Sequence, residues 1–313
     1  MVIKVKNKNV VFMGTPEFAV PVLEMLIKET NVLMVVTQPD KMVGRKKEMQ
    51  FSPVKEVAIK HNIEVFQPMK IRLDYEPLKK LDIDLIITCA FGQILPKEVL
   101  DLPKYGSINV HASILPKYRG SAPIEYSIMN GDKETGITIM YMDEGMDTGD
   151  IITISKLPIE DSDNKKTLSE KLAILGRDTL KNSLEDIFNK TNSRTKQSNN
   201  FSLASKIKRC DERIDFNDFG KNIINKIRAL NPSPLANLVI DNKEIKVISA
   251  KFAEASVSHV SQIVKIDKFE IGISCKDGII YLEKVKPEGK KEMEIRSYLN
   301  GINKELYLGK KVN

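Results

Sequence analysis

Two side chains suited to charge stabilisation and proton transfer, Asn109 and His111, stand two positions apart in the sequence. They belong to the apolar run SINVH at 107–111, which is typical of a buried strand. Alternate residues of a strand face one side, and open α/β sheets bind ligands at the carboxyl ends of their strands. An amide can donate a hydrogen bond to a developing oxyanion, and an imidazole can move protons near neutral pH. For His111 alone, a structural histidine bonded to backbone is the commoner situation.

A second polar cluster spans 143–150, with the sequence DEGMDTGD. Its glycines suit a tight loop whose backbone approaches a ligand. A solvated acidic turn is the alternative. The spacing differs from that of the twelve-residue calcium loop, so we expect no metal here. Cys89, Cys210 and Cys275 form no CxxC pair, which argues against a cysteine zinc site and fits a reducing cytosol.

Alternating strand and helix patterns position these clusters in the first half of the chain. Short apolar runs predict strands at 9–14, 32–37, 64–66, 85–89 and 107–111, and helices after Pro16 and over 53–61. Thr15 is expected to cap the first helix. A strand pair at 135–142 and 150–155 follows, and then a long helix over 167–189. Nearly all-apolar strands separated by helices indicate an α/β fold with a Rossmann-like, mostly parallel sheet.

Several function classes lose support from motifs that the sequence lacks. The first strand–helix turn has no GxGxxG fingerprint and no GxxxxGK[ST] occurs, which argues against nicotinamide and nucleoside triphosphate chemistry. The N-terminus does not resemble a secretory signal, and no run of 18 apolar residues exists. We therefore expect a cytoplasmic protein with no membrane segment.

The second half of the chain has a different pattern. A helix is predicted over 220–230, ending before Pro232, and short strands with Gly and Asp-Gly turns are predicted at 238–241, 244–250, 261–266, 270–275 and 278–286. Such a series suggests a small OB-like β-barrel. We accordingly predict a catalytic domain over 1–190, a basic linker over 191–208 and the barrel domain over 209–313.

Charge is unevenly distributed, although the net value is only +7. Residues 191–313 carry 23 Lys or Arg against 15 Asp or Glu, whereas 1–190 carry 26 against 27. A long loop at 38–52 adds a further group of cations. Such clusters suit a polyanion, of which nucleic acid is the commonest. On charge alone, a soluble basic protein with a solvated linker is the favoured interpretation.

Several segments together resemble the methionyl-tRNA formyltransferases, within the 10-formyltetrahydrofolate-dependent formyltransferase family. They are FMGTPEFAV, VVTQPD with GRKK, SINVHASILPKYRGSAPI, GITIMYMDEGMDTGDII, SKIKRCDERIDF, IRALNPSP and GKKEM with YLNG. The resemblance covers essentially the whole chain. The segments with Asn109, His111 and Asp147 are similar to the wider formyltransferase family. The basic loop and the added barrel narrow the resemblance to the members that act on methionyl-tRNA.

The resemblance implies transfer of a formyl group from 10-formyltetrahydrofolate, the donor substrate, to the α-amine of methionine on initiator tRNA. In that step negative charge develops on the formyl oxygen and the amine loses a proton. Asn109 would donate to the oxygen, His111 would handle the proton, and Asp147 would orient the imidazole. No metal and no covalent intermediate are required. A monomer in a bacterial-type cytoplasm is expected.

The resemblance also implies contact residues. The donor is expected to touch Phe91, Gly92, Ser113, Ile114, Leu115 and Pro116. The tRNA is expected to contact cations of the long loop and the linker, namely Lys41, Arg45, Lys46, Lys47, Lys206, Lys208 and Arg209. Cations of the barrel would add to this surface: Lys246, Lys251, Lys286, Lys290 and Lys291. The sequence departs from the family pattern at Lys46, where glycine is usual, at Phe216, where tryptophan is frequent, and at Ser233, where an aromatic residue is common.

Three other functions share parts of this pattern. A formyltransferase acting on glycinamide ribonucleotide or an amino sugar nucleotide would keep the three catalytic candidates without needing the basic loop, linker or barrel. A hydrolase that releases formate from the folate would share the catalytic set and act without tRNA. A non-catalytic RNA-binding protein would explain the charge and leave the Asn-x-His and Asp-Thr-Gly pairing unexplained.

Overall fold

The computed structural model describes residues 5–43 and 48–313, and these form two compact units. The first comprises the chain up to Pro123 together with Glu134–Pro158 and Ser169–Ser205. The second comprises Ile124–Lys133, Ile159–Leu168 and Lys206–Asn313. Two short stretches of the first half thus cluster with C-terminal residues. The domain limits expected at 190 and 209 stay predictions.

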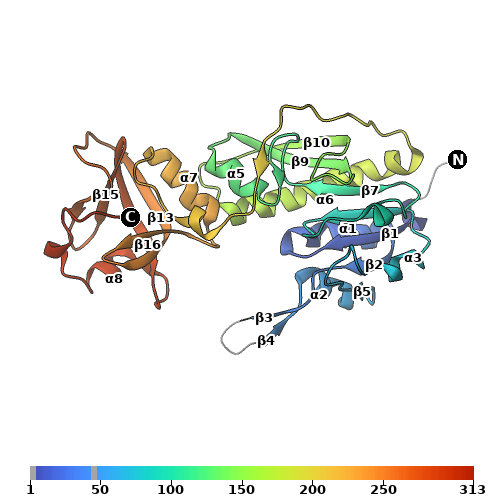
Figure 1. Ribbon diagram of the computed structural model, residues 1–313, viewed down its shortest axis with the longest axis horizontal. Coiled ribbons are helices and arrows are strands. Elements are labelled where there is room, and N and C mark those ends of the chain that lie inside the picture. Colours follow the sequence, from blue (N-terminus) through green and yellow to red (C-terminus); the bar gives the residue numbers. More distant parts are fainter. Residues whose placement is uncertain (1–4, 44–47) are drawn as a thin grey trace. The chain divides into compact units, whose positions relative to one another are not determined.

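A seven-stranded sheet forms the core of the first unit (Figure 1). In spatial order its strands are β10 (Ile151–Pro158), β9 (Glu134–Tyr141), β7 (Ser107–His111), β6 (Leu85–Cys89), β1 (Asn9–Gly14), β2 (Asn31–Val36) and β5 (Glu64–Phe66). From β7 to β5 the strands are parallel, while β9 runs antiparallel to β7 and β10 antiparallel to β9. Every residue of β6 is buried, as expected for a strand covered on both faces. The predicted mostly parallel α/β sheet is confirmed.

The helices connect and cover these strands. They are α1 (Val20–Glu29), α2 (Pro53–Lys60), α3 (Glu76–Lys79), α4 (Lys97–Leu100), α5 (Pro123–Met129) and α6 (Lys165–Asn189). The boundary between the two units falls within α5 and within α6. In the described part of the chain, no helix combines the length and the apolar character needed to cross a bilayer.

The start of the first helix differs from the prediction. Thr15 does not cap it, because a 3-10 turn (Glu17–Ala19) preceded by Pro16 leads into α1, and neither start has a side-chain cap. The Thr15 hydroxyl instead donates to the carbonyl of Phe91 (3.3 Å) and accepts from the backbone N–H of Gln38 (3.3 Å). These contacts join the ends of three strands, and they outweigh the local preference for a cap.

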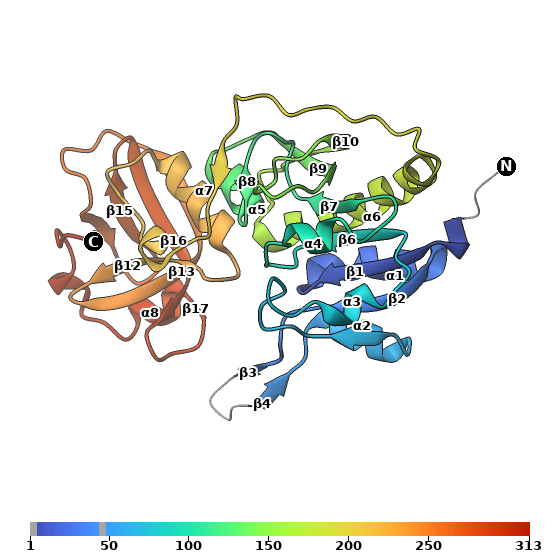
Figure 2. The same cartoon turned by 45° about the vertical axis from the view of Figure 1, so that its right-hand side comes forward.

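The segment 38–52 is not simply the long loop that the sequence predicts. It contains an antiparallel ribbon, β3 (Lys41–Val43) paired with β4 (Glu48–Gln50), which extends away from the sheet (Figures 1 and 2). Met42 and Met49 are cross-strand partners and are 61% and 59% exposed. Lys41 is exposed on β3, whereas Arg45, Lys46 and Lys47 lie outside the described residues.

Hydrogen bonds fix the base of this ribbon to the sheet edge. The ammonium of Lys55 lies 2.5 Å from Asp40 Oδ2 and 2.8 Å from Gln67 Oε1. The amide of Gln67 donates to Asp40 Oδ1 and to the carbonyl of Gln38, both at 2.9 Å. The bond from Lys55, and then that from Gln67, holds the pKa of the Asp40 carboxyl below its usual value. The ribbon therefore leaves the sheet from a defined anchor.

The second unit is an antiparallel β structure, as predicted for the C-terminal part. Its strands run in the order β12 (Ala236–Ile240), β13 (Lys243–Glu254), β16 (Gly278–Pro287), β15 (Ile271–Cys275) and β14 (Ile263–Ile266), with β17 (Met293–Glu294) also paired to β16. The C-terminal tail bridges the two outer strands: Val239 exchanges backbone bonds with Asn313, and Ile263 exchanges them with residues 309–310. The tail thus connects the two outer strands of this antiparallel sheet.

Helix α7 (Gly220–Leu230) covers β13, and its Arg228 binds the part of the first half that joins this unit. The guanidinium Nη1 donates to the carbonyls of Glu160 (3.0 Å), Asp161 (2.6 Å) and Asp163 (3.0 Å). Burial lowers the pKa of Arg228, although the charges of the Asp161 and Asp163 carboxylates act in the opposite direction. Phe216, at a position where the family often has tryptophan, is 1% exposed in the core of this unit.

Candidate active site

Asn109, His111 and Asp147 come together beside strand β7 in the sheet of the first unit. Asn109 and His111 lie on β7, and both reach the carboxylate of Asp147 from the same face of that strand. Asn109 Nδ2 is 3.4 Å from Asp147 Oδ1, and His111 Nδ1 is 3.6 Å from Oδ2. The side chains of His111 and Asp147 are 6% and 16% exposed, so the group is largely withdrawn from water.

The amide of Asn109 has a defined orientation. The hydroxyl of Thr88, on the neighbouring strand β6, donates to Asn109 Oδ1 at 2.8 Å. This bond occupies the carbonyl end and turns the NH2 group toward Asp147. The donor end is therefore the end presented at the site, as stabilisation of an oxyanion requires.

The imidazole of His111 is oriented by backbone. Its Nε2 lies 3.0 Å from the carbonyl oxygen of Tyr118. A carbonyl can only accept, so Nε2 carries the hydrogen in this contact. Nδ1, which faces Asp147, is then the nitrogen that can take up a proton, and the carboxylate is placed to stabilise the resulting cation.

The loop 143–149, here called the Asp147 loop, is closed by its own side chains. Asp143 Oδ1 accepts from the backbone N–H of Gly145 (3.0 Å) and from the hydroxyl of Thr148 (2.6 Å). Any side chain at Gly149 would collide with the carbonyl oxygen of Tyr141. The Asp147 carboxylate also accepts the backbone N–H of Gly120 at 2.8 Å. The carboxylate thus has a fixed place beside the imidazole.

The segment 192–204, here called the strap, lies along the first unit instead of hanging as a free linker. Thr195 and Ile151 exchange backbone bonds (2.8 and 2.9 Å), and β11 (Leu203–Ala204) pairs with β8 (Arg119–Gly120). Figure 2 shows the strap returning along β10 after α6. Its residue Gln197 contacts the Asp147 loop, and no periodic pattern in the sequence singles this residue out.

The residues expected to contact the folate donor fall into two groups. Phe91, Ser113 and Leu115 are 4%, 0% and 2% exposed, and Ser113 Oγ donates to the carbonyl of Lys117 at 2.6 Å. These buried side chains build the loops. Surface is presented by the others, which are exposed or half-buried: Gly92, Ile114 and Pro116.

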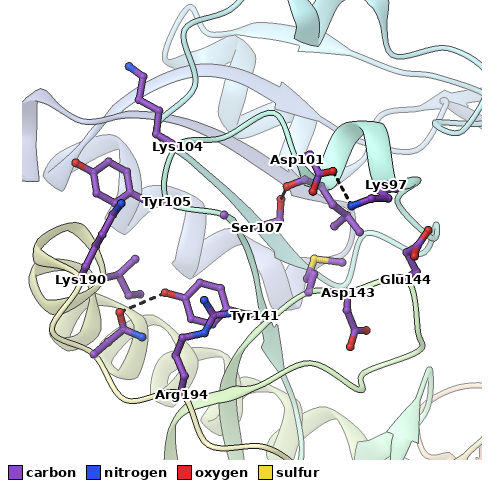
Figure 3. A pocket seen from close by; sticks show the side chains of 15 residues that line it. Lys97, Asp101, Lys104, Tyr105, Ser107, Tyr141, Asp143, Glu144, Lys190 and Arg194 are labelled. Carbon is purple, nitrogen blue, oxygen red and sulfur yellow. Dashed lines mark hydrogen bonds and ion pairs between the residues drawn. The ribbon is translucent and has the colours of Figure 1, made fainter.

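A cavity of about 510 Å³ lies at the start of β7, between α4, the end of β9 and the end of α6 (Figure 3). Ser107 lies at its edge two residues before Asn109, and Asp143 and Glu144 bring the beginning of the Asp147 loop into its wall. Four cations also line it, at Lys97, Lys104, Lys190 and Arg194. None of the six expected donor-binding residues is among those lining residues.

The cations expected to bind RNA differ in how they are engaged. Lys206 and Lys208 are exposed. Arg209, by contrast, is ion-paired with both Glu212 and Glu244. In the barrel, Lys251 pairs with Glu283 (2.7 Å) and Lys246 donates to the carbonyl of Pro234 (2.9 Å), while the remaining three are exposed: Lys286, Lys290 and Lys291. Across residues 5–43 and 48–313, no three His, Cys, Asp or Glu side chains are grouped as metal ligands would be.

Comparison with known proteins identifies the family. Residues 7–184 match the formyl transferase family, and residues 206–303 match the C-terminal domain of formyl transferases. The chain is 46% identical over 302 residues to the methionyl-tRNA formyltransferase of Staphylococcus epidermidis, covering 95% of this chain and 97% of that protein. The chain belongs to the methionyl-tRNA formyltransferase family. A relative of the same name from Staphylococcus aureus is 44% identical over 309 residues, covering 97% and 99% of the two chains.

Solved structures show that the fold extends beyond the methionyl-tRNA formyltransferases. An N-formyltransferase of Helicobacter canadensis, in complex with folinic acid and dTDP-3-aminofucose, has a TM-score of 0.68 at 24% identity, covering 90% of this chain and all of that one. HypX of Aquifex aeolicus in complex with tetrahydrofolic acid has a TM-score of 0.62 at 16% identity, covering 93% and 46%. These likenesses establish a shared fold.

Proposed function

We propose that this protein transfers a formyl group from 10-formyltetrahydrofolate to the α-amine of methionine esterified to initiator tRNA, the step that prepares this tRNA for translation initiation. The observation that carries the proposal is the meeting of Asn109, His111 and Asp147 at one point of a formyltransferase fold. A glycinamide ribonucleotide or sugar formyltransferase could use the same three side chains. The 46% identity to a methionyl-tRNA formyltransferase over nearly the whole chain favours the tRNA acceptor.

The three side chains divide the work of the transfer. The donor substrate supplies the formyl carbonyl, on whose oxygen negative charge develops during attack by the amine. Asn109 Nδ2 donates to that oxygen, a contact that is worth about 10²–10³ in kcat where it has been removed from other enzymes. His111 Nδ1 accepts the amine proton, which typically contributes about 10²–10⁴. The bond between the formyl carbon and N10 of the folate then breaks, N10 takes up the proton held by the imidazolium, and tetrahydrofolate leaves. Asp147, 3.6 Å from Nδ1, stabilises the imidazolium.

We place the donor beside Asn109 and His111, toward the carboxyl end of β7, where open α/β sheets bind ligands. The exposed or half-buried surface of Gly92, Ile114 and Pro116 would flank it there. The cavity of Figure 3 lies at the start of β7, and none of these three residues lines it, so the donor is not assigned to it. Bound 5-formyltetrahydrofolate, an analogue that is not consumed, should slow backbone hydrogen exchange over 91–93 and 112–119. Protection confined to 97–107 and 141–144 would refute this placement.

We place the tRNA on the ribbon and on exposed cations beyond the strap. Lys41 lies on the ribbon, and Lys206 and Lys208 follow the strap. Arg45, Lys46 and Lys47 follow Lys41 in the sequence, outside the described residues, and are proposed as contacts from the resemblance alone. Phosphate contacts of this kind position an RNA without reading its sequence. The protein is proposed to act as a monomer in the bacterial cytoplasm, where aminoacylated tRNA is made and used. Light scattering on the purified protein tests the monomer.

Replacement of the proposed base tests the mechanism. His111→Ala should abolish transfer of labelled formyl to methionyl initiator tRNA, because the imidazole is the group that takes the amine proton, while folate binding stays largely intact. His61→Ala is the matched control, since that histidine is exposed at the end of α2. Normal turnover by the His111 variant would refute the assignment.

A further inference from the structure

One polar side chain outside the catalytic group, Gln197 of the strap, uses both ends of its amide beside Asp147. Its Nε2 donates to the carbonyl of Asp147 and to the carbonyl of Gly149, both at 2.8 Å. Its Oε1 accepts from Arg119 Nε at 2.9 Å and from Nη2 at 2.8 Å. Four good hydrogen bonds from one amide fully satisfy its donors and its acceptor lone pairs.

These bonds act on the backbone that carries the catalytic carboxylate. Asp147 has a φ of 54°, a left-handed conformation that a residue with a side chain holds only when its surroundings impose it. Gln197 binds the carbonyl of Asp147 itself and the carbonyl two residues on. Without those two bonds the loop keeps the bonds of Asp143 to Gly145 and Thr148, which close the loop around Asp147 but do not bind the backbone of Asp147 itself.

The other end of the amide ties the same loop to β8. Arg119 is 9% exposed, and the next residue, Gly120, is the one whose N–H donates to Asp147 Oδ2. A side chain at Gly120 would approach the carbonyl oxygen of Ala204 to 2.6 Å, so β8 lies tightly against the end of the strap. Gln197 thus links the two segments that hold the Asp147 carboxylate. One is the Asp147 loop, which carries the carboxylate, and the other is β8, whose Gly120 N–H binds the carboxylate oxygen.

The strap also supports the imidazole of His111 indirectly, through the backbone of Tyr118. Ser202 Oγ accepts the backbone N–H of Tyr118 at 2.9 Å, and the carbonyl of Tyr118 is the acceptor for His111 Nε2. The strap is held at its other end by the Thr195–Ile151 pair. Gln197 therefore sits in a segment that is fixed on both sides of it, as a residue that positions other groups must be.

We propose that Gln197 is a positioning residue for formyl transfer, which holds the Asp147 loop so that the carboxylate faces His111 and Asn109. This inference rests on the proposed catalytic role of Asp147. It assigns a function in the reaction to the strap, which the sequence alone suggests to be a linker.

Gln197→Glu separates the two halves of the contact. A carboxylate still accepts from the Arg119 guanidinium, so β8 and the strap remain bound. It cannot donate to the carbonyls of Asp147 and Gly149, and it places an oxygen against them instead. If Gln197 serves only to satisfy Arg119, the Glu variant resembles the wild type. If it holds the Asp147 loop, the Glu variant is impaired although it is folded.

The experiment compares Gln197→Glu, Asp147→Asn, the double variant and Ser193→Ala in steady-state formyl transfer. Ser193→Ala is the matched control, because it removes a strap bond to the carbonyl of Ile152 (2.7 Å) without touching the Asp147 loop. Misplacement of a catalytic group by about 1 Å can cost about 10²-fold, so we expect kcat of Gln197→Glu to fall by about tenfold to a hundredfold. Both Michaelis constants should change little, and the control should behave as the wild type.

The double variant decides whether Gln197 acts through Asp147. With the carboxylate already replaced, Gln197→Glu should cause little further loss. Wild-type kcat in the Gln197→Glu single variant, or an undiminished further loss in the double variant, would overturn the inference while leaving the proposed function standing. Full activity of Asp147→Asn would instead refute the role of Asp147, and the inference would fall with it.

Discussion

Two hydrogen bonds orient the Asn109 amide, and Thr88→Val removes the shorter of them, which makes this variant a quantitative test of the oxyanion contact. Valine keeps the shape of threonine on β6 and removes the 2.8 Å bond to Asn109 Oδ1. The amide can then turn by 180° and present its carbonyl to the reacting oxygen. Asn109→Ala removes the amide altogether, so its decrease in kcat is the upper limit for the decrease caused by Thr88→Val.

The expected magnitudes follow from these contacts. A neutral hydrogen bond of this kind contributes about 0.5–1.5 kcal/mol, and 1.4 kcal/mol corresponds to about a tenfold change in rate. The 3.4 Å contact of Nδ2 with Asp147 Oδ1 still favours the correct orientation. We therefore expect Thr88→Val to lower kcat by about threefold to tenfold, whereas Asn109→Ala lowers it by about 10²–10³.

Single-turnover formyl transfer with saturating donor and methionyl initiator tRNA measures these rates, and thermal unfolding shows whether the variants remain folded. In the Asn109→Ala background, Thr88→Val should have almost no further effect, because no amide is left to orient. An equal loss from Thr88→Val in both backgrounds would refute the reasoning, since the hydroxyl would then act through strand packing and not through Asn109.

Two further predictions concern the tRNA. Asp40→Asn removes the charge that binds Lys55 at the base of the ribbon. The variant should therefore have a higher Michaelis constant for tRNA and a nearly unchanged Michaelis constant for the folate donor. Equal changes in both constants would contradict the proposal that the ribbon acts in tRNA binding alone. Replacing Lys206 and Lys208 by alanine should flatten the salt dependence of tRNA binding, by about one unit of slope for each phosphate that the protein no longer neutralises. Arg209→Ala should flatten it less, because two carboxylates already neutralise that guanidinium; an equal or larger effect of Arg209 would show that its ion pairs open on binding.

Elements with strong local patterns were predicted closely from the sequence. Strands β1, β5, β6 and β7 and helix α7 have the predicted bounds, and α6 begins two residues earlier than expected. Buried parallel strands are nearly uniform in apolar residues, so their limits are marked in the sequence itself. The catalytic candidates Asn109 and His111 could be placed on one face of β7 because side chains alternate regularly between the two faces of a strand.

Features that depend on distant contacts carried no such pattern. Gln197 lies in a polar stretch without periodicity, and its hydrogen bonds to Asp147 and Gly149 join residues 50 and 48 positions apart in the chain. Thr15 has the residue type of a helix cap, yet its hydroxyl is engaged by the loops at Gln38 and Phe91. Hydrogen bonds between a side chain and remote backbone are specified by the tertiary fold, so local sequence patterns do not reveal them.

The organisation of the second unit shows the same limit. In the sequence, Arg228 is one more cation on the predicted helix over 220–230. In the structure it binds the carbonyls of Glu160, Asp161 and Asp163, and these residues cluster with the barrel although they belong to the first half of the chain. A backbone carbonyl has no sequence signature, so this grouping could not have been predicted.

The most direct test of the central claim is a comparison of acceptors. Labelled formyl from 10-formyltetrahydrofolate is offered to methionyl initiator tRNA, methionyl elongator tRNA and glycinamide ribonucleotide under identical conditions, with the wild-type protein and with Asn109→Ala. We predict label on the initiator tRNA alone, and a decrease of about 10²–10³ in its rate of transfer in the variant. Label on glycinamide ribonucleotide, or free formate without any acceptor, would contradict the assignment of this protein to tRNA formylation.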